Sequence, residues 1–187
     1  MTISQRQAGL ILVLLGLAGL AVAIPKNAQV AGLRDTCRVL TVYDGDTIGC
    51  DLNQNGRIEK PQEQIRMLGI DTPEMHYSRK NKTHDSAHPT DEPYAKAASV
   101  WTEHALFHQT AYLDYDHDRH DRYSRTLAYV YTQPKNGVNV GETLLQQGYA
   151  RVLFIGANRK MAARYYPIEE QARRSRVGLW NGTQSAQ

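Results

Sequence analysis

Three short segments of the sequence concentrate charged residues whose types and order could carry out phosphoryl chemistry. They are 44–47 (DGDT), 66–74 (RMLGIDTPE) and 121–125 (DRYSR). Asp46 and Asp71 are expected at strand ends, and carboxylate and carbonyl oxygens are the ligands that Ca²⁺ prefers. Arg66 and Arg125 carry planar, permanently charged groups that match a phosphate. A hard cation and two arginines would stabilise charge growing on phosphoryl oxygens, so the set predicts phosphodiester hydrolysis.

Each segment alone also has an ordinary structural interpretation. An Asp-Gly pair is typical of a hairpin turn, Asp-Thr-Pro-Glu is a good start for a helix or loop, and DRYSR is typical of a solvated charged turn. Their occurrence in one chain favours a common site. In such a site, Glu74 would be the spare carboxylate that orients or deprotonates water.

The elements that must position these segments follow from hydropathy and turn residues. Residues 37–50 alternate around Asp-Gly and predict a β-hairpin. Further strands are expected at 65–70, 110–115 and 126–131. Helices are expected at 94–108, 140–147 and 159–176. With 149–155 as a strand or extended segment and 75–93 as a long exposed loop, the order indicates an α+β fold with a small closed sheet.

The three segments in series resemble the staphylococcal nuclease, or thermonuclease, family. The motifs are V-x-D-G-D-T, R-x-L-G-I-D-T-P-E and D-x-Y-x-R-x-L-A-Y-V-Y, and the similarity covers about residues 38–180. The resemblance implies a five-stranded OB-type β-barrel with three helices. It also implies calcium-dependent endo- and exonuclease hydrolysis of DNA and RNA that leaves 3′-phosphate ends. The alternative is a catalytically inactive nucleic-acid-binding module of the same fold.

The resemblance further implies a role for each matching residue. Asp46 and Asp71 are similar to the family's calcium carboxylates, and Thr72 is similar to the residue that offers its backbone carbonyl. Glu74 resembles the general base or water-positioning group. Two phosphate-binding arginines are implied at Arg66 and Arg125.

The resemblance also implies substrate-binding residues, both in the segment just before Arg125 and at positions 154 and 156. Arg125 would also lie near the leaving oxygen, and Tyr123 would contact the nucleotide's terminal phosphate, with Arg122 in place of the usual lysine. Where the family has two tyrosines beside the base, this chain has Phe154 and Gly156. Phe154 can stack on a base, whereas Gly156 cannot.

The N-terminal region is expected to lie outside the nuclease-like domain. Residues 8–24 form an unbroken apolar run behind Arg6, which is typical of a signal peptide or an uncleaved membrane anchor. Either would place the nuclease-like domain outside the cytoplasm, as a secreted, periplasmic or membrane-anchored protein. We expect the domain to be a monomer. The expected division is 1–25 signal or anchor, 26–36 linker, 37–181 nuclease-like domain and 182–187 polar tail.

The two cysteines flank the predicted Asp-Gly turn. In an oxidising compartment, Cys37 and Cys50 could form a disulfide between adjacent strands. A two-residue turn would pair residue 39 with residue 50, which leaves the cysteines one diagonal step off register. A disulfide and two free thiols therefore both remain open.

Three further features have two interpretations each. Asp51, Asn53 and Asn55 match the start of a calcium loop, but the segment could be a simple Asn-Gly turn. The basic helix expected at 159–176 could follow a nucleic-acid backbone or cover the barrel with its arginine stems. The 75–93 loop contains three histidines: His76, His84 and His88. These side chains could bind a metal, or the loop could be simply solvated. The net charge of +3 excludes a polybasic packaging protein.

Overall fold

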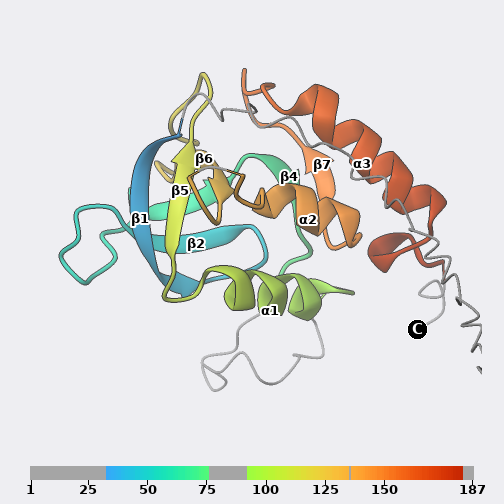
Figure 1. Cartoon of the computed structure of the whole chain (residues 1–187), viewed down its shortest axis with the longest axis horizontal. Coiled ribbons are helices and arrows are strands. Elements are labelled where there is room, and N and C mark those ends of the chain that lie inside the picture. Colours follow the sequence, from blue (N-terminus) through green and yellow to red (C-terminus); the bar gives the residue numbers. More distant parts are fainter. Residues whose placement is uncertain (1–32, 76–91, 135, 183–187) are drawn as a thin grey trace, which may run out of the picture.

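The computed structural model describes residues 33–75, 92–134 and 136–182, which form a closed β-barrel with helices on its outside (Figure 1). Around the barrel, the strands are β1 (Leu33–Val42), β2 (Thr47–Asp51), β3 (Gln64–Met67), β6 (Thr126–Tyr131) and β5 (Thr110–Asp114). The neighbouring strands β3 and β6 run parallel, and the other neighbours run antiparallel. The predicted five-stranded OB-type barrel of an α+β fold is thereby confirmed.

Three α-helices and one short 3₁₀ turn complete the described chain. They are α1 (Ala95–Leu106), α2 (Val140–Gln146), α3 (Ala162–Arg174) and η1 (Gly178–Trp180). Helix α1 packs against β1, and α2 lies between β6 and α3 (Figure 1). Within residues 33–75, 92–134 and 136–182, no helix is both long enough and apolar enough to cross a membrane.

The barrel begins earlier than the sequence predicts. Strand β1 starts at Leu33, inside the segment 26–36 that we expected to be a linker. Barrel closure requires this, because β1 pairs with β5 through residues 33–38 and with β2 through residues 38–42. The other expected features at 1–25, 76–91 and 183–187, including the apolar run and the three loop histidines, lie outside the described residues.

The strand predicted at 65–70 is divided into two. After β3, the chain turns at Gly69 and continues as β4 (Gly69–Asp71), which leaves the barrel and pairs with β7 (Arg151–Leu153). Gly69 has φ +82°, and a Cβ atom there would lie 2.7 Å from the Tyr165 ring and 2.9 Å from the Phe154 ring. The turn therefore requires glycine, and it carries Asp71 out over the end of the barrel.

The two cysteines form a disulfide that joins β1 to β2. Val39 lies opposite Cys50 in the ladder, so Cys37 is the diagonal neighbour of Cys50, with a Cα–Cα distance of 5.5 Å. Both cysteines are buried among the core side chains of the barrel. The disulfide interpretation is confirmed, and the bond ties the first strand to the hairpin that carries Asp46.

Replacing both cysteines is expected to destabilise the domain by about 3 kcal/mol, because the cross-link restricts the unfolded chain. Urea denaturation of a Cys37→Ala/Cys50→Ala variant measures this loss. Reduced wild-type protein should show a similar loss. A midpoint equal to that of the oxidised wild type would contradict the expectation.

The segment that resembles a calcium loop forms a turn whose side chains bond to its own backbone. Asp51 accepts hydrogen bonds from the N–H groups of Asn55 and Gly56, and buried Glu63 accepts from those of Leu52, Asn53 and Glu59. In the described part of the chain, no group of three or more His, Cys, Asp or Glu side chains is placed to hold a metal. A second calcium site therefore stays an untested prediction.

All three arginines of helix α3 form ion pairs within the fold. Arg164 pairs with Glu142 of α2, while Arg173 and Arg174 pair with Glu169 and Glu170 one turn earlier. These contacts favour the interpretation of α3 as a covering helix over that of a surface that follows nucleic acid.

Candidate active site

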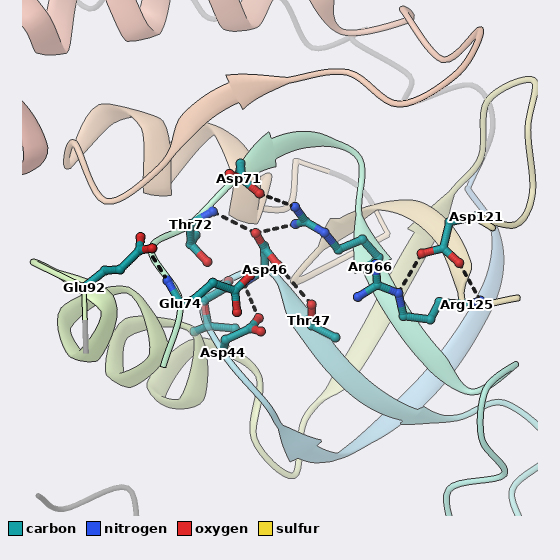
Figure 2. Close-up of polar contacts among 12 residues, drawn as sticks. Asp44, Asp46, Thr47, Arg66, Asp71, Thr72, Glu74, Glu92, Asp121 and Arg125 are labelled. Atoms are coloured by element: carbon teal, nitrogen blue, oxygen red, sulfur yellow. Dashed lines mark hydrogen bonds and ion pairs between the residues drawn. The ribbon is translucent and has the colours of Figure 1, made fainter. Parts of the chain in front are cut away.

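One end of the barrel brings the three charged segments together (Figure 2). Asp46 directly precedes β2, and its carbonyl accepts a hydrogen bond from the N–H of Met67 at 2.8 Å. Thr47 of β2 lies opposite Arg66 of β3. Because β3 and β6 are parallel neighbours, Arg66 also lies beside Leu127, two residues after Arg125. Residues far apart in sequence thus share one end of the barrel.

Arg66 lies between two of the predicted metal-binding carboxylates (Figure 2). Its Nη2 donates to Asp71 Oδ1 at 2.6 Å, and its Nη1 forms an ion pair with Asp46 Oδ2. Burial alone would lower the pKa of Arg66, but Asp46 and Asp71 outweigh it and raise the pKa above its usual value. The guanidinium is therefore a permanent cation held at a fixed position.

The predicted carbonyl donor, Thr72, is tied to the same network. Its backbone N–H donates to Asp46 Oδ2 at 2.7 Å, and the hydroxyl of Thr47 donates to Asp46 Oδ1 at 3.0 Å. Asp46 and Thr72 are both buried. Asp46 is thereby oriented by groups from β2, β3 and the end of β4, a rigid support of the kind that a binding site requires.

Acidic groups outnumber the cations at this end of the barrel. Burial, followed by repulsion from Asp46 and Glu74, raises the pKa of Asp44 to about 8. Burial raises the pKa of Asp71 more than Arg66 lowers it. Burial and Asp46 also raise the pKa of Glu74. Neighbouring carboxylates repel one another when they are all ionised, and a bound divalent cation would offset that repulsion.

The donor set fits a hard cation by its chemistry. Asp46, Asp71 and the Thr72 carbonyl provide only oxygens, and three protein ligands leave coordination positions for water and phosphate. The structure brings these residues together with Glu74, whose exposed side chain is accessible to water. Their roles as ligands and base stay predictions.

Arg125 is anchored by Asp121, which begins the same DRYSR segment but was not predicted to have a role of its own. Its Nε donates to Asp121 Oδ2 at 2.6 Å, and its backbone N–H donates to Asp121 Oδ1 at 3.0 Å. Burial opposes the charge of Asp121, but the hydrogen bonds from Arg125 prevail and lower its pKa. The guanidinium is thus oriented by Asp121, and the Arg125 side chain keeps 24% of its surface exposed.

The residues predicted to contact substrate lie at two places. Tyr123 and Arg122 are exposed on the loop that precedes β6, and Arg122 Nη2 donates to the Tyr123 hydroxyl at 2.6 Å. Phe154 follows β7, with Tyr166 5.9 Å away and the Arg159 guanidinium 5.3 Å from its ring. A base that stacks on Phe154 would therefore also meet an exposed tyrosine.

Glycine at position 156 departs from the family pattern, and the local packing explains why a larger residue does not fit there. Its φ is +60°, and a Cβ atom there would collide with the Asp118 carboxylate. The Asp118 carboxylate accepts a hydrogen bond from the Ala157 N–H at 2.9 Å, and the Asp118 N–H donates to Asn158 Oδ1 at 2.8 Å. The glycine thus lets the loop before β6 pack on the turn after β7.

Asp44 is a functional candidate that sequence reasoning missed. It accepts a hydrogen bond from the Asp46 N–H at 3.1 Å and lies beside Glu74 in the acidic cluster (Figure 2). Its place in an Asp-Gly-Asp turn was a usable signal, because a turn that supplies one carboxylate to a site brings its neighbour close. Glu92, whose carboxylate accepts from Glu74 N at 3.4 Å, carried no such signal.

Comparisons with known proteins agree with the geometry. Residues 64–182 match the sequence model of the family described as Staphylococcal nuclease homologue. The thermonuclease of Staphylococcus hyicus is 34% identical over 146 residues, which cover 78% of this chain and 76% of that protein. The uncharacterized protein MJ1439 of Methanocaldococcus jannaschii is 35% identical over 156 residues, or 77% of this chain and 70% of that protein. Endonuclease YncB of Bacillus subtilis is 33% identical over 140 residues, or 74% of this chain and 58% of that protein.

Proposed function

We propose, from the premise that the chain belongs to the staphylococcal nuclease family and is a nuclease, that it hydrolyses DNA and RNA in a calcium-dependent reaction that leaves 3′-phosphate ends. The observation that carries the proposal is the contact of Arg66 with both Asp46 and Asp71, beside Glu74. An inactive binding module would have no need to retain this combination of a base, acidic ligands and two arginines.

Asp46, Asp71 and the carbonyl of Thr72 would hold the Ca²⁺, which when bound polarises the phosphate and offsets its charge. Glu74 accepts a proton from water as the water oxygen forms a bond to phosphorus and the P–O5′ bond breaks. The raised pKa of Glu74 favours this role, because a carboxylate that holds a proton more readily is a better base near neutral pH.

The two arginines act on the phosphate itself. Charge accumulates on the phosphoryl oxygens and on the departing O5′ as the bond breaks. Arg66 donates to the phosphoryl oxygens, and Arg125 donates to the phosphate beside the leaving oxygen, which finally takes up a proton. Both side chains are held in place by acids, so little reorganisation is needed when the charge develops.

Substrate binding on the leaving side would depend on Tyr123, Arg122 and Phe154. The first two would contact a phosphate, and Phe154 would stack on a base. Stacking reads no base edge, which agrees with action on DNA and RNA without strong sequence preference. We further propose that the domain acts as a monomer.

We also propose that the domain acts outside the cytoplasm. The apolar run at 8–24 and the disulfide between Cys37 and Cys50 support this, because such bonds persist in oxidising compartments. Mass spectrometry of the mature protein tests the two forms. A cut after Ala23 would indicate a signal peptide, an intact N-terminus in the membrane fraction would indicate an anchor, and intact protein in the cytosol would contradict export.

Incubation of the purified protein with plasmid DNA and with RNA tests the proposed activity. With Ca²⁺, both are expected to be degraded to products with 3′-phosphate ends, and a chelator is expected to stop the reaction. Glu74→Gln is the matched variant, since it keeps the shape and removes the base. Undiminished cleavage in chelator would contradict calcium dependence, and nucleic-acid binding without cleavage would support the inactive module.

A further inference from the structure

A pocket of about 290 Å³ opens beside the proposed active site. Its lining includes Asp71, Thr72 and Glu92. Arg151 and four residues near the end of the described chain also line it: Gly178, Leu179, Asn181 and Gly182. In Figure 2, Glu92 lies across the site from Arg125. The pocket therefore extends away from the side where Arg125 and Tyr123 would hold the leaving nucleotide.

We propose that this pocket binds the nucleotide on the 5′ side of the scissile phosphate, and that Arg151 binds the next phosphate along that strand. The inference rests on the proposed function. A strand that crosses Arg66 must extend from the scissile phosphate in two directions. One direction leads to Arg125 and Tyr123, and the other leads into the pocket.

Strand β7 supports this division of the substrate. Arg151 at its start lies opposite Asp71, and Leu153 at its end lies opposite Gly69, next to Phe154. Arg151 begins this strand and Phe154 directly follows it, so the two residues are about 10 Å apart along the chain. A dinucleotide that stacks one base on Phe154 would carry its other nucleotide toward Arg151.

The pocket has the chemistry of a nucleotide site. Pro73, Pro93 and Leu179 offer apolar surface to a sugar and base, and Asn181 adds a polar side chain to the lining. The volume is near the lower end of the roughly 300–1,000 Å³ range of small-molecule sites. It suits one nucleoside.

Arg151 is suited to a phosphate because its charge is not already matched. Within the described part of the chain it has no carboxylate partner, whereas Arg66, Arg125 and Arg164 each have one. Its side chain is exposed, and its guanidinium lies 5.6 Å from the Trp180 ring. This contact orients the guanidinium and leaves its N–H groups available to phosphate oxygens.

Two small substrates distinguish the pocket from the rest of the site. One is a 5′-phosphorylated thymidine dinucleotide, and the other is the methyl ester of thymidine 5′-phosphate, which has only a methyl group on the 5′ side. In both, water attacks phosphorus, the P–O5′ bond breaks and thymidine leaves with a proton on O5′. Arg151→Gln is expected to lower kcat/KM for the dinucleotide about tenfold, which corresponds to one charge-assisted hydrogen bond, and to leave the methyl ester unchanged.

Three variants control this result. Arg151→Lys should recover part of the loss. Arg38→Gln lies in β1, opposite Asp51 at the far end of β2 from Thr47, and should change cleavage of neither substrate. Asn181→Trp, at an exposed rim position, should obstruct the pocket and reduce only dinucleotide cleavage. Equal substrate preference in the wild type, Arg151→Gln and Asn181→Trp would overturn the proposal.

A wild-type protein that cleaves no nucleic acid would instead contradict the proposed function. Calorimetric titration with the same dinucleotide then tests the pocket without turnover. Binding about tenfold weaker in Arg151→Gln would support the pocket, and equal binding would overturn it.

Discussion

Arg125→Lys is expected to lower kcat by about 10²–10³-fold, with a much smaller change in KM. A lysine keeps the positive charge but loses the planar fork that contacts phosphate and Asp121 together. Lysine also has no counterpart to the Nε that donates to Asp121 at 2.6 Å. Steady-state kinetics on a synthetic oligonucleotide measures the loss.

The neighbouring acid provides the matched control for this variant. Asp121→Asn keeps the guanidinium and weakens only its orientation, so its kcat should fall between those of the wild type and Arg125→Lys. Thermal unfolding of both variants separates loss of fold from loss of catalysis. An Arg125→Lys protein that is folded and has nearly wild-type kcat would show that Arg125 does not act on the phosphate.

Asp44→Asn is expected to stabilise the metal-free protein at pH 8 to 9 by at least ~1 kcal/mol. The pKa of Asp44 in the fold is about 8, against an ordinary value of 3.8. Between these values the folded chain keeps a proton that the unfolded chain has released. The free energy of unfolding therefore falls as pH rises through this window, and the variant removes that decline. Denaturation in chelator from pH 4 to 9 measures the slope.

Asp121→Asn is a control with the opposite sign. Because the pKa of Asp121 is lowered in the fold, its ionised form stabilises the protein above its ordinary pKa, and that contribution is lost as pH falls. This variant should therefore be less stable than the wild type at pH 7. Two results together would contradict the raised pKa of Asp44: a free energy of unfolding of the wild type that rises from pH 5 to 8 in chelator, and no added stability in Asp44→Asn.

The sequence was sufficient to predict the elements whose signals are local. Helices α1, α2 and α3 lie within their expected ranges because each has apolar spacing or a helix-ending glycine such as Gly148. The break between β3 and β4 was not predictable in this way. It depends on how the Tyr165 and Phe154 rings, nearly a hundred residues later, pack against Gly69. The start of β1 at Leu33 likewise depends on a distant strand, because residues 33–38 of β1 pair with the edge of β5.

The candidate site shows the same division between local and distant signals. The motifs identified the residues that we propose to act on the substrate, because their side-chain types indicate phosphoryl chemistry. The partners that orient them were missed. Asp121 lies in the DRYSR segment but was not predicted to anchor Arg125, and Asp44 was interpreted only as a turn residue, although its place beside Asp46 was a usable signal. The pocket beside Asp71 combines β4, β7 and the C-terminal turn, so only the folded chain brings its walls together.

Calorimetric titration of Ca²⁺ into the purified protein tests the central claim most directly, which is that Asp46 and Asp71 hold one divalent cation at the end of the barrel. The wild type is predicted to bind one Ca²⁺ at this site, and Asp46→Asn/Asp71→Asn is predicted to lose that binding. Asp51→Asn, in the turn that resembles a calcium loop, should retain it. Unchanged Ca²⁺ affinity and stoichiometry in the double variant would contradict the account.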